Sequence, residues 1–102
     1  MRNASTELAY ELDGKANVKC ADITYSRNHS HKITLPVDYT GQEYIDFMDK
    51  LDFEYDNGYG GQELFGTVWL EDDTWLERWE YDGSEGWEHK KLPQIPAELI
   101  KS

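Results

Sequence analysis

Residues 64–81 read LFGTVWLEDDTWLERWEY, and this stretch decides the fold. It consists of two apolar runs, rich in Trp, Leu and Thr, that are separated by an acidic break. Aromatic and β-branched residues favour strands, and adjacent Asp residues favour turns. The pattern therefore predicts a β-hairpin with strands over 64–71 and 74–81.

The turn of this hairpin determines which residues share a face of the sheet. If positions 72–73 form a two-residue turn, each strand residue faces the one that is equally distant from the turn. The expected pairs are Leu70 with Trp75, Trp69 with Leu76, Val68 with Glu77, and Thr67 with Arg78. Both faces of the hairpin then carry large apolar side chains. One face is expected to pack on a helix, and the other to be covered by N-terminal strands or partly exposed.

Outside the hairpin, further segments show the two-residue period and the turn signals of strands. Strands are expected over 7–12, 17–25, 31–37 and 87–91, with an Asp13-Gly14 turn between the first two. The order of apolar residues in 17–25 breaks strict alternation, which predicts a bulge there.

One helix is expected from about Gly41 to Asp52. Thr40 and Glu43 have the Thr-x-x-Glu spacing of a capping box at its start. Apolar side chains at three- and four-residue steps form the expected buried stripe, which consists of Tyr44, Phe47, Met48 and Leu51.

These elements predict one α+β domain over residues 1–102. We expect an antiparallel β-sheet of about five to six strands with one helix packed on it, in the order strand-strand-strand-helix-strand-strand-strand. No apolar run approaches the ~20 residues that span a bilayer, and no signal-peptide core follows the N-terminus. The single cysteine, Cys20, agrees with a reducing compartment. The expected location is the cytoplasm of the host cell.

Acidic residues are concentrated in one part of the chain. Residues 38–88 hold sixteen of the 21 acids but only two basic residues, Lys50 and Arg78, and they contain all four tryptophans. A folded surface with this much uncompensated charge repels itself, which costs stability. A positively charged partner would explain why the charge is tolerated. Direct binding to nucleic acid or to anionic membranes is disfavoured, because both are polyanions.

The acids of the hairpin recur at intervals comparable to those of nucleic-acid phosphates. Residues two apart on a strand are about 6.6 Å apart on one face. The charge contacts predicted for a partner are Glu71, Asp72, Asp73, Glu77, Glu80, Asp82 and Glu85, with Asp46 and Asp49 as a second row. Trp69 is the aromatic residue expected to be exposed. The alternative, weighed equally, is an acidic surface that merely faces solvent.

Other candidate sites are incomplete. Residues 52–63 reproduce the acidic positions of an EF-hand loop, but Asn57 occupies the glycine position and a strand follows. His29, His31, Cys20 and His89 supply no recognisable tetrahedral set. No phosphate-binding loop or nucleophile elbow is present in the sequence. We therefore expect no cofactor, no metal and no enzymatic activity, with a calcium-binding loop over 52–63 as an open alternative.

The segment GTVWLEDDTWLERWEYDGSEGWE, residues 66–88, followed by LPQIP at 92–96, resembles a C-terminal hairpin of small proteins from tailed phages and prophages. The size and charge of the chain also resemble those of phage-encoded anti-CRISPR and anti-restriction proteins, several of which mimic DNA. That resemblance implies a protein that occupies the cationic nucleic-acid channel of an effector complex or nuclease.

The first functional hypothesis is therefore a phage-encoded, non-enzymatic inhibitor of a host nucleic-acid-binding defence system. It would bind a basic channel, such as that of a CRISPR effector or a nuclease, by acidic charge mimicry. The second hypothesis is an immunity protein that neutralises a basic nuclease toxin, since the same charge and size fit it equally well. A phage accessory or structural protein is the third.

Overall fold

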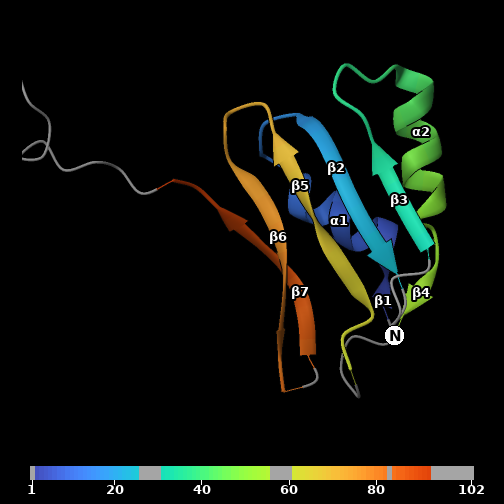
Figure 1. Ribbon diagram of the computed structural model, residues 1–102, viewed down its shortest axis with the longest axis vertical. Coiled ribbons are helices and arrows are strands. Elements are labelled where there is room, and N and C mark those ends of the chain that lie inside the picture. The colour runs from blue at the N-terminus through green and yellow to red at the C-terminus, as the bar shows by residue number, and fades with distance from the viewer. Residues whose placement is uncertain (1, 26–30, 56–60, 83, 93–102) are drawn as a thin grey trace, which may run out of the picture.

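The computed structural model describes residues 2–25, 31–55, 61–82 and 84–92. In these residues a layer of helices packs on one face of an antiparallel sheet (Figure 1). In chain order the elements are β1 (Arg2–Asn3), α1 (Ala4–Leu12), β2 (Val18–Tyr25), β3 (His31–Leu35), α2 (Gly41–Lys50), β4 (Glu54–Tyr55), β5 (Leu64–Leu70), β6 (Trp75–Tyr81) and β7 (Ser84–Lys90).

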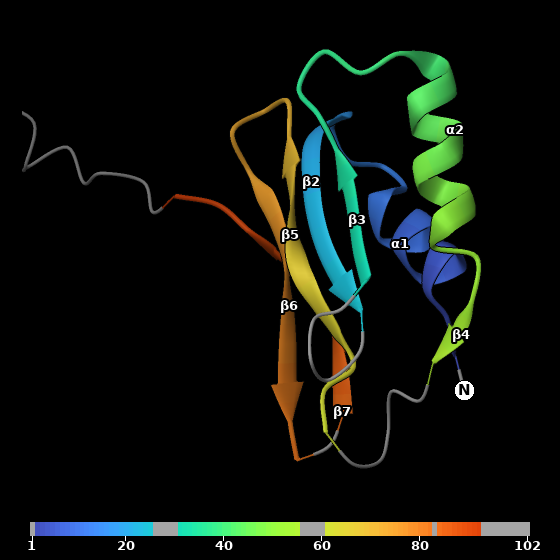
Figure 2. The same ribbon diagram turned by 45° about the vertical axis from the view of Figure 1, so that its right-hand side comes forward.

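The main sheet has five strands in the order β3-β2-β5-β6-β7, and every neighbouring pair is antiparallel. The short strands β1 and β4 form a separate two-stranded sheet. Figure 2 shows that α1 and α2 lie on the same side of the main sheet. We call the other side the open face, because no helix or strand of the described ranges packs on it.

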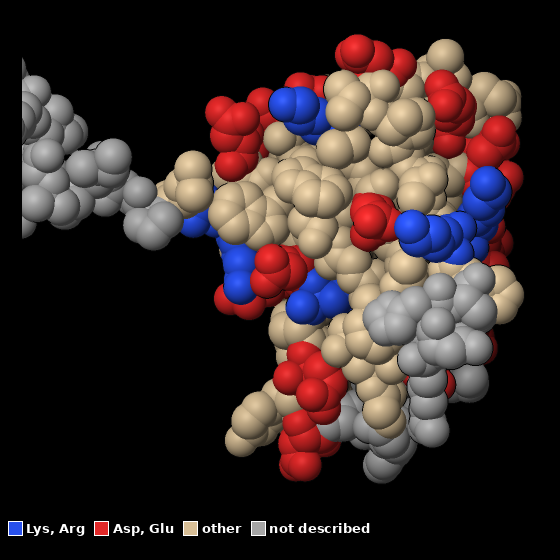
Figure 3. All heavy atoms as spheres, viewed as in Figure 1, with Lys and Arg blue, Asp and Glu red and all other residues tan. Residues whose placement is uncertain are grey.

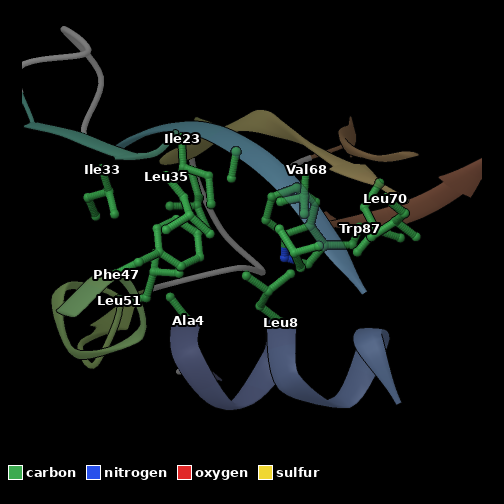
Figure 4. Close-up of a cluster of buried hydrophobic side chains, with 14 of the residues drawn as sticks. Ala4, Leu8, Ile23, Ile33, Leu35, Phe47, Leu51, Val68, Leu70 and Trp87 are labelled. Atoms are coloured by element: carbon green, nitrogen blue, oxygen red, sulfur yellow. The ribbon is translucent and has the colours of Figure 1, made fainter. Parts of the chain in front are cut away.

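The core lies between the sheet and the two helices (Figure 4). Alternate residues of each strand point into it, as the period of two requires. Leu8 of α1 and Phe47 of α2 are almost fully buried against Ile23 and Val68 of the sheet. Burial of each such side chain contributes roughly 1.5–3 kcal/mol, so this layer accounts for much of the stability of the fold.

Two expectations for the first half of the chain are confirmed. The capping box of α2 is present: the Glu43 amide donates to the Thr40 hydroxyl at 3.1 Å, and the Thr40 amide donates to the Glu43 carboxylate at 3.0 Å. Strand β2 contains the predicted irregularity, since its pairing with β5 shifts between Val18 and Cys20.

The expectation of a strand over 7–12 is wrong, because this segment belongs to helix α1. The Asn3 side chain accepts from the Thr6 amide at 3.0 Å and so caps a helix start that the sequence reading overlooked. Gly14, in a left-handed conformation with φ of 78°, follows the helix instead of forming a hairpin turn. The described part of the chain therefore contains two helices, and the predicted element order and single helix are incorrect.

The hairpin of β5 and β6 is confirmed, but its predicted register is wrong by one residue. Trp69 pairs with Trp75, and Val68 pairs with Leu76. The loop contains three residues rather than two: the Asp73 amide donates to the Leu70 carbonyl at 3.3 Å, and Asp73 has a φ of 66°. The extra residue places both tryptophans on the open face and both aliphatic residues in the core.

The last described strand, β7, begins three residues earlier than the predicted strand over 87–91. Within the described part of the chain, no helix is long and apolar enough to cross a membrane.

Candidate functional site

The open face carries a row of exposed aromatic side chains. Trp69 lies on β5 and pairs with Trp75 on β6, and alternation along β6 places Trp79 and Tyr81 on the same face. Trp69 is 41% exposed, which confirms the expectation for this residue, and Trp79 and Tyr81 are 40% and 78% exposed. Exposed aromatic residues grouped on one face are typical of protein interfaces.

Trp79 packs over its cross-strand neighbour, Gly86. A Cβ atom at Gly86 would be only 3.0 Å from Cζ2 of the Trp79 ring. The indole therefore needs glycine beneath it, and Trp79 remains 40% exposed. Trp79 is thus packed against the sheet and is still accessible to a partner.

A hollow of about 500 Å³ borders the other end of the aromatic row. Its walls include Trp69 and Trp75, and Asp73 of the hairpin loop lines it together with Lys19 and Leu92. It therefore combines two indole rings, one carboxylate and the ammonium group of Lys19. The rings and the carboxylate are groups that a planar cation uses.

Two carboxylates stand opposite each other in the middle of the open face. Glu77 of β6 pairs with Glu88 of β7, and like charges in direct opposition destabilise a sheet. Lys90 donates to Glu77 at 2.8 Å, and this hydrogen bond holds the pKa of the Glu77 carboxyl below its usual value. The pKa of Lys90 is raised by the same hydrogen bond and by the charges of Glu77 and Glu88. One ammonium group therefore serves two carboxylates.

Further acids lie at both ends of β6; one of them, Glu80, follows Trp79 in the strand and by alternation points to the helical side rather than to the open face. Glu71, Asp72 and Asp73 form the loop before β6, and Glu80 and Asp82 lie at its far end; all five are exposed. We call these five residues the acidic rim. From Asp73 to Asp82 the strand spans about 30 Å. Figure 3 shows this side of the molecule: acidic residues gather along its edges, and both acidic and basic residues lie among uncharged ones nearer the middle.

The conformation of the rim loop is fixed locally. The Asp72 carboxylate accepts hydrogen bonds from the Thr74 hydroxyl and, at 3.2 Å, from the Thr74 amide. The hydroxyl bond is the main reason that the pKa of Asp72 is lowered. The Asp72 carboxylate is thus ionised at neutral pH and is held in place by Thr74.

Asp46 and Asp49 do not join the rim. Both are exposed on α2, which packs on the helical side of the sheet beside β3. Strand β3 is three positions from β6 in the sheet, a separation of about 14 Å. The predicted second row of acids therefore lies on a different side of the molecule.

Glu85 is misplaced among the predicted surface contacts, because it is only 3% exposed. Its carboxylate accepts from the Arg78 guanidinium at 2.6 Å and from the amides of Glu63 and Leu64 at 2.9 and 3.0 Å. All of its charge is therefore compensated inside the protein. A partner cannot reach it while the fold is intact.

Arg78 is the centre of a buried polar network that sequence reasoning missed. Its guanidinium contacts Glu85, donates to Glu7 at 3.2 Å and to the Tyr55 hydroxyl at 3.0 Å, and lies 5.0 Å from the centre of the Trp87 ring. The network joins α1, β4, β6 and β7. The sequence offered one signal of this network: Arg78 is a basic residue that alternates with Leu76 onto the core-facing side of its strand.

Tyr55 gives this network a testable response to alkaline pH. Its hydroxyl donates to Glu7, and burial together with this bond raises its pKa well above the usual 10.0. The folded state holds this proton more tightly than the unfolded state. The stabilisation is therefore complete below about pH 10 and is lost as pH rises further.

We expect Tyr55→Phe to cost about 1–3 kcal/mol at pH 7, because Glu7 and Arg78 lose a buried partner. Urea unfolding at pH 7 and above pH 10 measures the effect. The mutant should lose less stability than the wild type between these pH values. Tyr39 and Tyr44, whose pKa values are also raised by burial, are present in both proteins, so the difference isolates Tyr55. Equal alkaline losses in both proteins would contradict the assignment.

The other predicted sites receive no support as binding sites from the described residues. Part of the candidate calcium loop, 56–60, and His29 lie outside them. Asp52, the first residue of that loop, instead accepts from the Asn3 side chain at 2.9 Å. In the described ranges, no group of three or more His, Cys, Asp or Glu side chains is placed to hold a metal ion.

Comparison with protein-family models, with curated proteins and with solved structures found no match for this chain.

Proposed function

We propose that this chain is a non-enzymatic inhibitor, of phage origin, that binds a basic nucleic-acid-binding surface of a host defence protein. Such a protein would act as an anti-CRISPR or anti-restriction inhibitor, and its target would be a CRISPR effector or a nuclease. The observation that carries the proposal is the acidic rim, which places exposed carboxylates at both ends of β6. Its carboxylates occupy positions that phosphates would take on the partner.

The dimensions of the rim support charge mimicry. The span of about 30 Å along β6 corresponds to about nine base pairs at 3.4 Å of rise per nucleotide. A net charge of −11 on 102 residues also steers the chain toward a cationic surface and away from nucleic acid itself. Steering of this kind raises association rates and weakens as salt is added.

The test compares two variants with the same change in net charge. The rim variant is Glu71→Gln, Asp72→Asn and Asp73→Asn, and the control is Asp13→Asn, Asp46→Asn and Asp49→Asn on the helical side. Amides preserve shape, and Asn tolerates the left-handed conformation of position 73. Each immobilised protein is incubated with nuclease-treated bacterial lysate. Bound protein is eluted by rising salt and, in parallel, by duplex DNA.

We expect the wild type and the control to retain a nucleic-acid-binding protein, and we expect salt or duplex DNA to elute it. The same protein should bind the rim variant at least about tenfold more weakly, because three charge contacts are lost. Capture of a single small nuclease would instead favour an immunity protein. Equal retention by both variants, or a bound protein that duplex DNA does not displace, would contradict charge mimicry.

A further inference from the structure

Rings and carboxylates alternate along the open face of β6. Trp75, Glu77 and Trp79 follow one another at intervals of about 6.6 Å, and Glu88 faces Glu77 from β7. This arrangement does not resemble a row of phosphates, which would contain no rings. It places a pair of negative charges between two indoles.

The guanidinium group of arginine fits this arrangement better than any other side chain. It is planar, stacks on indole faces, and forms paired hydrogen bonds with carboxylates. The ammonium group of lysine is compact and strongly hydrated, and it gains less from a flat ring. The hollow lined by Trp69, Trp75 and Asp73 offers rings and a carboxylate to a guanidinium. The exposed Trp79 offers the same groups together with Glu77, which lies two residues away on the same face.

We propose that the open face binds arginine side chains, which an extended segment of the partner presents along β6. The inference rests on the proposed function and specifies the chemistry of the partner surface. Alternate side chains of an extended segment project on one side at about 6.6 Å, the same interval as the residues of the β6 row. Successive arginines at alternate positions therefore align with Trp75, Glu77 and Trp79.

The negative charges of the open face also favour binding of a cation in addition to Lys90. Glu77 and Glu88 share the single ammonium group of Lys90, so their mutual repulsion is only partly relieved. A guanidinium placed between Trp75 and Trp79 would neutralise the second carboxylate. Binding of the guanidinium would therefore relieve the repulsion between Glu77 and Glu88 that destabilises the free protein.

Aromatic sheet faces also bind single-stranded nucleic acid by stacking its bases. The acids of this face and of the rim oppose that occupant, because each phosphate would approach a negative surface. Binding of a single-stranded oligonucleotide is therefore an alternative outcome of the test.

The test is calorimetric titration of the full chain, at low salt, with three probes. The first is a capped peptide of alternating arginine and glycine, the second replaces every arginine by lysine, and the third is a single-stranded oligodeoxythymidine. We expect the arginine peptide to bind more tightly than the lysine peptide, by about two- to fivefold for each ring that stacks. The oligonucleotide should not bind.

Three variants locate the site. Trp79→Leu keeps an apolar cover over Gly86 and should weaken binding of the arginine peptide by about fivefold. Glu88→Gln should weaken it by about threefold without lowering the unfolding midpoint, because it removes a like-charge pair. Tyr10→Leu is the control, since Tyr10 is an aromatic residue on α1 that is 80% exposed, more than Trp79; it should bind like the wild type.

The outcomes separate this inference from the proposed function. Equal affinity for both peptides, with no effect of Trp79→Leu, would overturn arginine recognition and leave cation binding through the rim intact. Failure of both peptides to bind would contradict both proposals. Binding of the oligonucleotide through Trp79 would overturn the inference in favour of nucleic-acid stacking.

Discussion

Replacing Arg78 by alanine is expected to destabilise the fold by about 3–5 kcal/mol, the usual cost of removing one partner of a buried ion pair. The carboxylates of Glu7 and Glu85 would remain buried without the guanidinium that now contacts both. The Tyr55 hydroxyl and the Leu64 carbonyl would also lose a donor. Urea unfolding followed by circular dichroism measures the loss.

Two companion variants interpret that result. Lys90→Ala removes an exposed ion pair with Glu77 and should change stability little, because solvent screens such pairs. A triple variant that also neutralises the acids, Arg78→Met with Glu7→Gln and Glu85→Gln, should be more stable than Arg78→Ala. A loss of less than about 1 kcal/mol for Arg78→Ala would contradict the conclusion that Arg78 compensates the buried charges of Glu7 and Glu85. The same conclusion would be contradicted if the triple variant were the least stable of the three.

Replacing Gly66 by alanine is expected to destabilise the fold by about 2–5 kcal/mol, from overpacking and from an unfavourable backbone conformation together. Gly66 has a φ of 143°, and a Cβ atom there would be 2.3 Å from the Asp22 carbonyl oxygen and 2.7 Å from the Ile23 Cα. Both neighbours are backbone atoms of β2, so they cannot move without separating β2 from β5.

Two other glycines separate these contributions. Gly14→Ala has the strained conformation, with φ of 78°, but no atom within 4 Å of the added methyl group, so it should cost only about 1–2 kcal/mol. Gly41→Ala has neither strain nor a close neighbour and should be neutral or slightly stabilising. Comparable unfolding midpoints for the three variants would contradict the close approach of β5 to β2.

Features that depend on neighbouring residues in the sequence were predictable. The capping box of α2 involves two residues three positions apart, and its apolar stripe is read from one helical period. Segment 7–12 was less clear, because an Asp-Gly pair marks both hairpin turns and helix ends. Leu8 and Leu12 have helical spacing, and Asn3 caps the helix start, so this segment favours a helix. Packing of the helix against the sheet stabilises it further.

The register of the central hairpin shows how much a single residue matters. Asp73 can enter the left-handed region at modest cost, so a three-residue loop competes with the two-residue turn that the sequence suggests. The three-residue loop is favoured because it buries Leu76 opposite Val68 and leaves the tryptophans together. The aromatic row could not be foreseen from the pattern alone.

The burial of Glu85 depends on contacts that are distant in the sequence. Its location within an acidic segment suggested the surface, and its actual place is set by Arg78 on the neighbouring strand and by the amides of Glu63 and Leu64. Buried charges require partners from several elements, and no local pattern identifies them. The candidate surface was thus predictable in its acidity and in Trp69, and the buried network was not.

The most direct measurement of the central claim is NMR mapping of the arginine-glycine peptide on the ¹⁵N-labelled full chain. If the open face is the binding surface, the largest shifts will occur in the indole N–H signals of Trp69, Trp75 and Trp79 and in the amides of β6 and β7. The amides of α1 and α2 should not move. Shifts confined to the helices, or no shifts at low salt, would show that the open face does not bind cationic partners.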